Sequence, residues 1–135
     1  MSKLLDQWEE DTRRGDAAAM CASFTPDMTF AIHEHIGART EDGAGDHDKM
    51  CAYLDKVVPL LAQKEKSVNV TRNSFTVTRY GLHWLTADVS YTEHREITLD
   101  SGLHLKQVSE DHLTLVKTLA GLRVTRLESD SRLVR

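Results

Sequence analysis

The sequence has little of what stabilises small exported domains or builds membrane segments. Its 135 residues include two cysteines, two prolines and only 6% aromatic residues. Two cysteines are too few for a disulfide framework. No stretch approaches the roughly 18 apolar residues that cross a bilayer, and the start, MSKLLDQWEED, has no apolar run typical of a signal peptide. We therefore expect a cytoplasmic protein that does not associate with membranes.

Strong charge of either sign is also missing. The chain carries 17 Lys and Arg against 21 Asp and Glu, a net charge of −4. It has no basic stripe with interleaved aromatic residues, which makes a nucleic-acid partner unexpected. It has no glycine-rich phosphate loop and no Gly-x-Ser-x-Gly sequence, and we expect no cofactor. The length fits one domain, residues 1–135, with room for a core or an internal pocket.

The two cysteines, Cys21 and Cys51, stand thirty positions apart, each within an apolar helical pattern. Without an export signal, this pattern indicates reduced, buried thiols. Neither cysteine has the clearly cationic or helix-start setting of a catalytic thiol, so we interpret both as structural.

The first half of the chain has helical periodicity. Helices are predicted over residues 3–14 and 17–24, separated by Gly15, with Asp16 as the second N-cap. Pro26 ends the second helix. A third helix is predicted from residue 47, after a loop over 37–46, and Pro59 should kink it or end it early.

The second half has strand periodicity. Alternation begins at residue 27 and returns in four segments, over about 67–80, 82–99, 103–118 and 121–130, with glycines between them. Short turns between long strands favour antiparallel neighbours. Helices followed by a run of strands predict an α+β fold with the helices on one face of a curved antiparallel sheet.

One strand face places a carboxyl group among apolar residues. In 103–118, Asp111 shares a face with Leu105, Leu113 and Leu115. Burial there would raise the pKa of the carboxyl group and suit it to proton donation. The alternatives are a bulge near Ser109 that turns Asp111 outward, or a structural pair with an arginine.

Three other polar residues interrupt strand faces. Glu93 and Arg95 lie two apart on one face and predict an ion pair, either structural or at a pocket rim. Tyr91, on the same face, has a hydroxyl group that could donate, although packing is the simpler role. Glu34 continues an apolar face and is either a second carboxylate of the site or a solvated strand end.

Histidines raise the question of a metal. His33 and His35 share a strand face and could supply two ligands. No third ligand follows at metal spacing, because the chain has no His-Glu-x-x-His and no Cys-x-x-Cys. We expect no metal site.

The chain resembles the nuclear transport factor 2-like superfamily, which includes SnoaL-like cyclases and ketosteroid isomerases. The resemblance rests on Trp8, on RRGDAAAMCASFTPDMTFAI at 13–32 and on EDHLTLVKTLAGLRVTRLE at 110–128. Together with the order of elements it covers nearly the whole chain. It implies a cone in which the curved sheet wraps the helices around an internal apolar pocket, and a homodimer formed through the outer sheet face.

The resemblance also assigns residues. Asp111 matches the isomerase aspartate that acts as a neutral hydrogen-bond donor in the pocket. The matching sequence departs from the isomerases twice, since Trp8 replaces a donor tyrosine and Ile32 stands where the base should be. It departs from the limonene-epoxide hydrolases too, because Arg95-x-Ile97 lacks their Arg-x-Asp pair.

The sequence therefore predicts a small enzyme of the SnoaL-like type, an isomerase, cyclase or dehydratase, that performs acid/base chemistry on a small hydrophobic molecule. Asp111 is the expected acid/base, and Glu34 or His33 the second proton acceptor. The expected pocket wall is Trp8, Ile32, Tyr53, Leu54, Val89, Tyr91 and Leu113. The alternative is a ligand-binding or dimerisation domain that kept the cone and lost the catalytic set.

Overall fold

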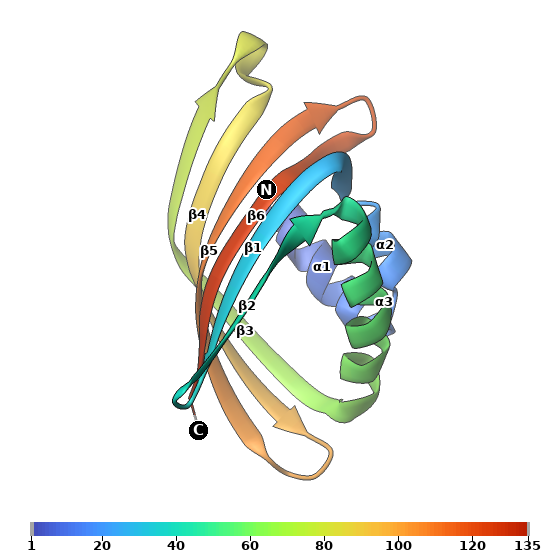
Figure 1. Cartoon of the computed structure of the whole chain (residues 1–135), viewed down its shortest axis with the longest axis vertical. Helices are drawn as coiled ribbons and strands as arrows, with labels where there is room; N and C mark the ends of the chain where they lie inside the picture. The colour runs from blue at the N-terminus through green and yellow to red at the C-terminus, as the bar shows by residue number, and fades with distance from the viewer. Residues whose placement is uncertain (1, 135) are drawn as a thin grey trace.

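The computed structural model describes residues 2–134 and consists of a helical layer against one curved sheet (Figure 1). The helices are α1 (Ser2–Arg14), α2 (Ala17–Cys21) and α3 (His47–Lys64), with a short 3₁₀ turn, η1 (Leu82–Trp84). The strands are β1 (Phe24–Ile36), β2 (Arg39–Asp46), β3 (Glu65–Tyr80), β4 (Thr86–Leu99), β5 (His104–Thr118) and β6 (Gly121–Val134). The predicted α+β architecture is confirmed.

The six strands form one sheet in the order β2-β1-β6-β5-β4-β3. Neighbouring strands are antiparallel except β1 and β6, which pair in parallel. The sheet bends around the three helices, which all lie on its concave side (Figure 1).

The corner between α1 and α2 follows its sequence signals. Gly15 adopts a positive φ of 71°, which ends α1, and the Asp16 side chain accepts a hydrogen bond from the Ala19 backbone N–H at 3.1 Å. The next strand starts earlier than predicted, at Phe24, and contains Pro26. The proline is tolerated because the β1–β6 register shifts between Phe24 and Thr29.

Two elements differ from the sequence expectation. Residues 39–46, predicted as a loop, form strand β2, which pairs with β1 in a hairpin at the sheet edge. Its side chains are mostly exposed, so it has no apolar alternation to reveal it. Helix α3 continues through Pro59 to Lys64. The turn at Pro59 packs against the α1–α2 corner, where a side chain on Gly15 would contact Pro59 and Ala62, and this packing offsets the lost backbone hydrogen bond.

The cysteine prediction was wrong. Cys21 and Cys51 form a disulfide that joins the end of α2 to α3, with their Cα atoms 5.3 Å apart. Helical periodicity placed each cysteine on an inward face but carried no information on how α2 and α3 approach one another. A covalent bond thus links two of the three helices, α2 and α3.

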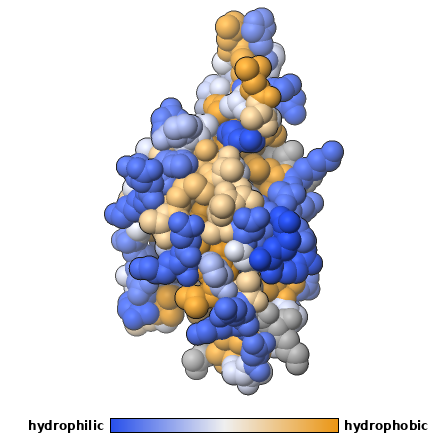
Figure 2. Space-filling model, turned by 90° about the vertical axis from the view of Figure 1, so that its right-hand side faces the viewer, coloured by the Kyte–Doolittle hydropathy of each residue, from blue (hydrophilic) through white to orange (hydrophobic). Residues whose placement is uncertain are grey.

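The core lies between the helices and the middle of the sheet. Its buried residues include Leu5 of α1, Met28 of β1, Leu54 of α3, Val89 of β4 and Leu113 of β5. Viewed from the helix side, apolar side chains cover the middle of the molecule and hydrophilic ones flank them (Figure 2). Among residues 2–134, no helix is both long and apolar enough to cross a membrane.

Candidate functional site

A pocket of about 250 Å³ lies between the helices and the inner face of the sheet. Its apolar lining comes from Leu5, Trp8, Met20, Ile32, Tyr91 and Leu127. Its charged lining comes from Glu9, Glu34, Arg72, Glu93, Arg95 and Asp111, and its other polar lining from Thr12, Gln107, Ser109, Ser129 and Ser131. The pocket is therefore amphipathic, with more charge than the apolar pocket expected from the sequence.

Strand register places Asp111 in the middle of this lining. Asp111 of β5 lies opposite Tyr91 of β4 and Ser129 of β6. The register is regular through Ser109 and Asp111, and the one shift in the β5–β6 pairing lies between Thr114 and Leu115. The bulge that could have turned Asp111 outward is thus not present, and its carboxyl group faces the pocket.

Two serines hold the Asp111 carboxyl group. Ser129 Oγ donates a hydrogen bond to Oδ1 at 2.6 Å, and Ser109 Oγ donates to Oδ2 at 3.3 Å. Burial raises the pKa of Asp111, and the nearby charge of Glu93 raises it further, while the serine hydrogen bonds act in the opposite direction. The net effect is a raised pKa of Asp111, which favours the protonated form. Ser129 and Ser109 remain in place to donate hydrogen bonds to the carboxylate form.

Strand β1 carries both candidate proton acceptors, Glu34 and His33, and places Glu34 at the pocket. Ile32 and Glu34 both line it, since alternate residues of β1 share a face. Glu34 belongs to β1, which lies two strands from β5 with β6 between them. Its backbone and that of Asp111 are therefore on the order of 10 Å apart. The two carboxyl groups can meet opposite ends of one small molecule.

His33 lies on the other face of the sheet. Its side chain is 52% exposed, and its Nδ1 lies 2.7 Å from Asp42 Oδ1. A shift of one residue along a strand reverses the face, so His33 does not line the pocket between the helices and the sheet. His33 and Asp111 do both line a second hollow, of about 560 Å³.

The expected wall residues divide into two groups. Trp8, Ile32 and Tyr91 line the pocket. Leu54, Val89 and Leu113 are instead packed in the closed core. Tyr53 lines a neighbouring hollow of about 280 Å³ between α3 and the β1–β2 hairpin, and this hollow shares Ile32 and Glu34 with the pocket.

Trp8 closes the pocket without offering it a hydrogen bond. Its indole Nε1–H donates to Ser23 Oγ at 2.8 Å. Its ring packs against Phe24, with centroids 5.6 Å apart. Trp8 is thus an apolar wall and does not replace the tyrosine donor of the isomerases.

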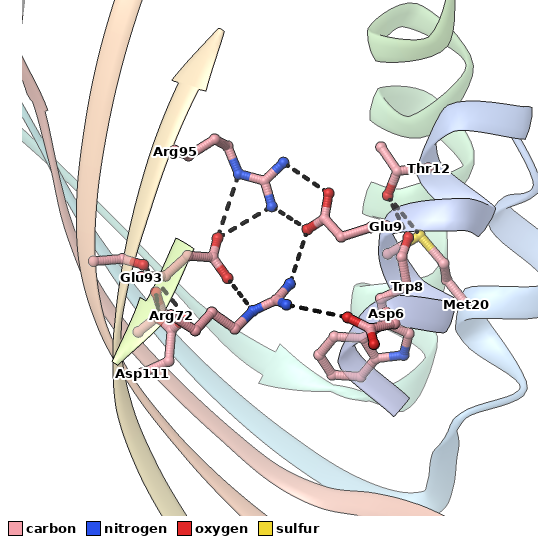
Figure 3. Close-up of polar contacts among 11 residues, drawn as sticks. Asp6, Trp8, Glu9, Thr12, Met20, Arg72, Glu93, Arg95 and Asp111 are labelled. Carbon is pink, nitrogen blue, oxygen red and sulfur yellow. Dashed lines mark hydrogen bonds and ion pairs between the residues drawn. The ribbon is translucent and has the colours of Figure 1, made fainter. Parts of the chain in front are cut away.

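An ion cluster forms one side of the pocket (Figure 3). Arg72 of β3 donates from Nε to Glu93 at 3.0 Å and from Nη2 to Glu9 at 3.2 Å. Arg95 of β4 donates from Nη2 to Glu93 at 3.1 Å and from Nη1 to Glu9 at 3.2 Å. The predicted Glu93–Arg95 pair is confirmed, and Asp6 lies 3.6 Å from Arg72 Nη1 at the exposed edge.

The cluster balances its own charge. Two guanidinium groups face the two carboxylates of Glu9 and Glu93, and their side chains are between 12% and 26% exposed. Because the donors and acceptors satisfy one another, the cluster fastens α1 to β3 and β4 at the rim of the pocket. Sequence reasoning missed Arg72 and Glu9, although Arg72 continues the alternation of Val68 and Val70, and Glu9 lies one helical turn after Leu5.

The side chains that lie close enough to share a metal ion are not His33 and His35, the pair considered from the sequence. His35 Nε2 lies 3.1 Å from Asp130 on the outer sheet face. Within residues 2–134, the one group of three side chains placed to hold a metal ion is Cys21, His47 and Cys51. This group lies between α2 and α3, and none of its members lines the Asp111 pocket.

Comparison with known proteins connects the chain to a fold. No protein-family model and no curated protein matches the sequence. Solved structures do match, at low identity. A nuclear transport factor 2-like protein with a cystatin-like fold from Novosphingobium aromaticivorans is 23% identical, with a TM-score of 0.66 over 95% of this chain and 77% of its own.

Two further structures come from proteins assigned as candidate dehydratases. A candidate scytalone dehydratase from Novosphingobium aromaticivorans is 10% identical, with a TM-score of 0.69 over 99% of this chain and 81% of its own. A candidate dehydratase of the nuclear transport factor 2-like family from Streptomyces avermitilis is 15% identical, with a TM-score of 0.67 over 96% and 91%. The chain therefore has the fold of the nuclear transport factor 2-like proteins, as the resemblance in its sequence predicted.

Proposed function

We propose that the chain is a small acid/base enzyme of the SnoaL-like type, in which Asp111 exchanges a proton with a molecule held in the pocket. The observation that carries this proposal is a pocket-lining carboxyl group that burial biases toward its neutral form and that two serines orient. A neutral carboxylic acid can donate to a carbonyl or hydroxyl oxygen. Ser129 and Ser109 then stabilise the carboxylate that remains.

Glu34 is the proposed partner in proton transfer. In a dehydration, it would take the proton next to a carbonyl group while the leaving hydroxyl group takes the proton of Asp111, so that water departs and a double bond forms. An isomerisation would use the same two groups without loss of water. The dehydratase assignments of two structural neighbours make dehydration the first reaction to test.

The lining favours a small substrate without negative charge. A volume of about 250 Å³ lies below the roughly 300–1,000 Å³ of sites for drug-sized ligands. The arginines of the lining are already paired with Glu9 and Glu93, so an anionic ligand would lack a free cationic partner. A hydroxylated carbonyl compound with one apolar face fits this combination.

The test begins with native mass spectrometry, which reports any molecule that copurifies with the full chain. A panel of hydroxylated ketones and aldehydes is then assayed for loss of water or double-bond migration. We expect Asp111→Asn to lower kcat by at least about 100-fold, the usual contribution of a positioned acid/base. The matched control is Glu110→Gln, one residue away on the outer face, which should retain activity.

The second candidate is a non-catalytic ligand-binding domain of the same fold. The apolar Ile32 in the base position and the occupied N–H of Trp8 favour it. Ligand binding that survives Asp111→Asn, with no turnover by either protein, would support this alternative. We also propose a homodimer through the outer sheet face, which the same mass spectra test by the mass of the intact assembly.

A further inference from the structure

Cys21, His47 and Cys51 form a compact group on the helical layer, away from the pocket. The disulfide joins the last residue of α2 to the second turn of α3, and His47 is the first residue of α3. The His47 ring lies against the disulfide, with Nε2 3.7 Å from Cys51 Sγ and 3.8 Å from Cys21 Sγ. These distances bring one imidazole nitrogen and two sulfurs, three potential metal ligands, within contact of one another.

The distances match those of a tetrahedral metal centre. Zinc binds thiolate sulfur at about 2.3 Å and imidazole nitrogen at about 2.0 Å, which places nitrogen and sulfur ligands roughly 3.6 Å apart. Both nitrogen–sulfur separations are already close to this value. Two sulfur ligands on one zinc lie roughly 3.8 Å apart. His47 Nδ1 also lies 3.8 Å from Cys51 Sγ, so metal binding requires rotation of the His47 ring to aim Nε2 as well as opening of the S–S bond.

Local structure preorganises the ligands. His47 and Cys51 are four residues apart on one helix, so their side chains share a face. The start of that helix is capped by Asp46, whose Oδ1 accepts from the Lys49 N–H at 3.1 Å. Asp48 Oδ1 lies 3.4 Å from His47 Nδ1, on the nitrogen that the proposed metal would not use.

We propose that these three residues form a redox-controlled site for a thiophilic divalent metal ion such as Zn²⁺. A dithiol reductant transfers two electrons and two protons to the disulfide, and it becomes a disulfide itself. The two released thiols then lose two protons to solvent as the metal binds their sulfurs and His47 Nε2. Water fills the fourth position. A disulfide oxidant that takes two electrons from the thiolates and two protons from solvent, and becomes a dithiol, would reform the S–S bond and release the metal.

The site would keep the helical layer cross-linked in both redox states. In the oxidised state the disulfide joins α2 to α3, and in the reduced state the metal does so through the same two sulfurs. All three side chains are partly exposed, so both the reductant and the ion can reach them.

The test titrates Co²⁺ into the full chain, oxidised and reduced, without oxygen and after removal of the reductant. The reduced protein should bind one Co²⁺ with the visible bands of a tetrahedral centre and near-ultraviolet thiolate charge transfer, and Zn²⁺ should displace it. Its melting temperature should rise with added Zn²⁺, because the folded state binds the ion. The oxidised protein should show neither response.

Variants identify the ligands. Cys21→Ser, Cys51→Ser and His47→Gln should each weaken binding at least tenfold in reduced protein, whereas His83→Gln, in the exposed β3–β4 turn, should not. The comparison of reduced with oxidised wild-type protein needs no variant, so it stands even if a substitution impairs folding. Equal binding in both redox states, absence of tetrahedral bands, or unchanged binding by His47→Gln would overturn the proposal.

Discussion

At the scale of single residues, the protonation of Asp111 is the property on which the proposed chemistry depends. Burial and the charge of Glu93 favour the neutral acid, whereas Ser129 and Ser109 favour the carboxylate. The result is a carboxyl group with a raised pKa that can still release its proton. Neither serine can be replaced by a larger apolar residue without changing this balance.

The raised pKa makes folding stability depend on pH. Because folded Asp111 holds its proton more tightly than the unfolded chain does, its contribution to stability is full below the unfolded pKa of about 3.9. That contribution is lost as the pH rises through the raised value. Urea unfolding should therefore show that wild type loses stability relative to Asp111→Asn as the pH increases over this window.

The control for this prediction is Asp55→Asn, an exposed residue of α3. This variant removes a carboxyl group outside the pocket and is measured in the same urea series. A constant difference between wild type and Asp111→Asn across the same range would contradict the assigned protonation.

The sequence predicted which sheet face a side chain occupies where alternation within one strand determines that face. Asp111 and Glu34 face the pocket for this reason. His33 does not face this pocket, because it is adjacent to Glu34 in β1 and its side chain therefore lies on the opposite face of the sheet. Residues that complete the site from other elements, Ser129 and Arg72, required the strand register, which alternation within one strand does not give.

At the scale of elements, α1 is fastened to the sheet by the carboxylate of Glu9. Both Arg72 and Arg95 donate to it. Since these arginines belong to β3 and β4, one helical side chain spans two strands. Loss of this carboxylate would leave two partly buried guanidinium groups sharing Glu93, with the exposed Asp6 as the other acidic partner of Arg72.

We expect Glu9→Gln to lower the free energy of unfolding by roughly 1–3 kcal/mol, the range for hydrogen bonds with charged groups. Glu10→Gln changes the same residue type on the same helix, but its ion pair with Arg13 is exposed, and we expect a loss below about 1 kcal/mol. Chemical denaturation of both variants measures the difference. Equal effects would mean that the cluster does not anchor α1.

Local signals predicted where α1 and α2 meet, because a positive φ at Gly15 and a cap at Asp16 depend on adjacent residues. Continuation of α3 through Pro59 was not predictable in this way. It depends on packing against Gly15, more than forty residues earlier in the chain. Strand β2 depends on its pairing with β1, which its own exposed residues do not encode.

At the scale of the whole molecule, the disulfide restricts how far the helices can separate when the chain unfolds. It closes a loop with a sequence separation of 30 residues that includes β1 and β2. Sequence reasoning could not find it, because the pairing reflects the approach of α2 to α3 in three dimensions.

Replacement of both cysteines by serine should destabilise the oxidised protein by roughly 3–4 kcal/mol, the loop-closure entropy of a loop of this length. Urea unfolding in metal-free buffer with a chelator measures this difference. Reduced wild-type protein under the same conditions should resemble the double variant. Coincident unfolding midpoints for oxidised wild type and the variant would contradict a stabilising cross-link.

The parallel pairing of β1 with β6 has a consequence for biosynthesis. A ribosome makes β1, which carries Glu34, long before β6, which carries Ser129 and lies between β1 and β5. During translation, Glu34 and Asp111 therefore belong to two separate parts of the nascent chain. Because β6 lies between β1 and β5, the sheet can bring the proposed catalytic pair together only after β6 has been synthesised and has paired with both strands.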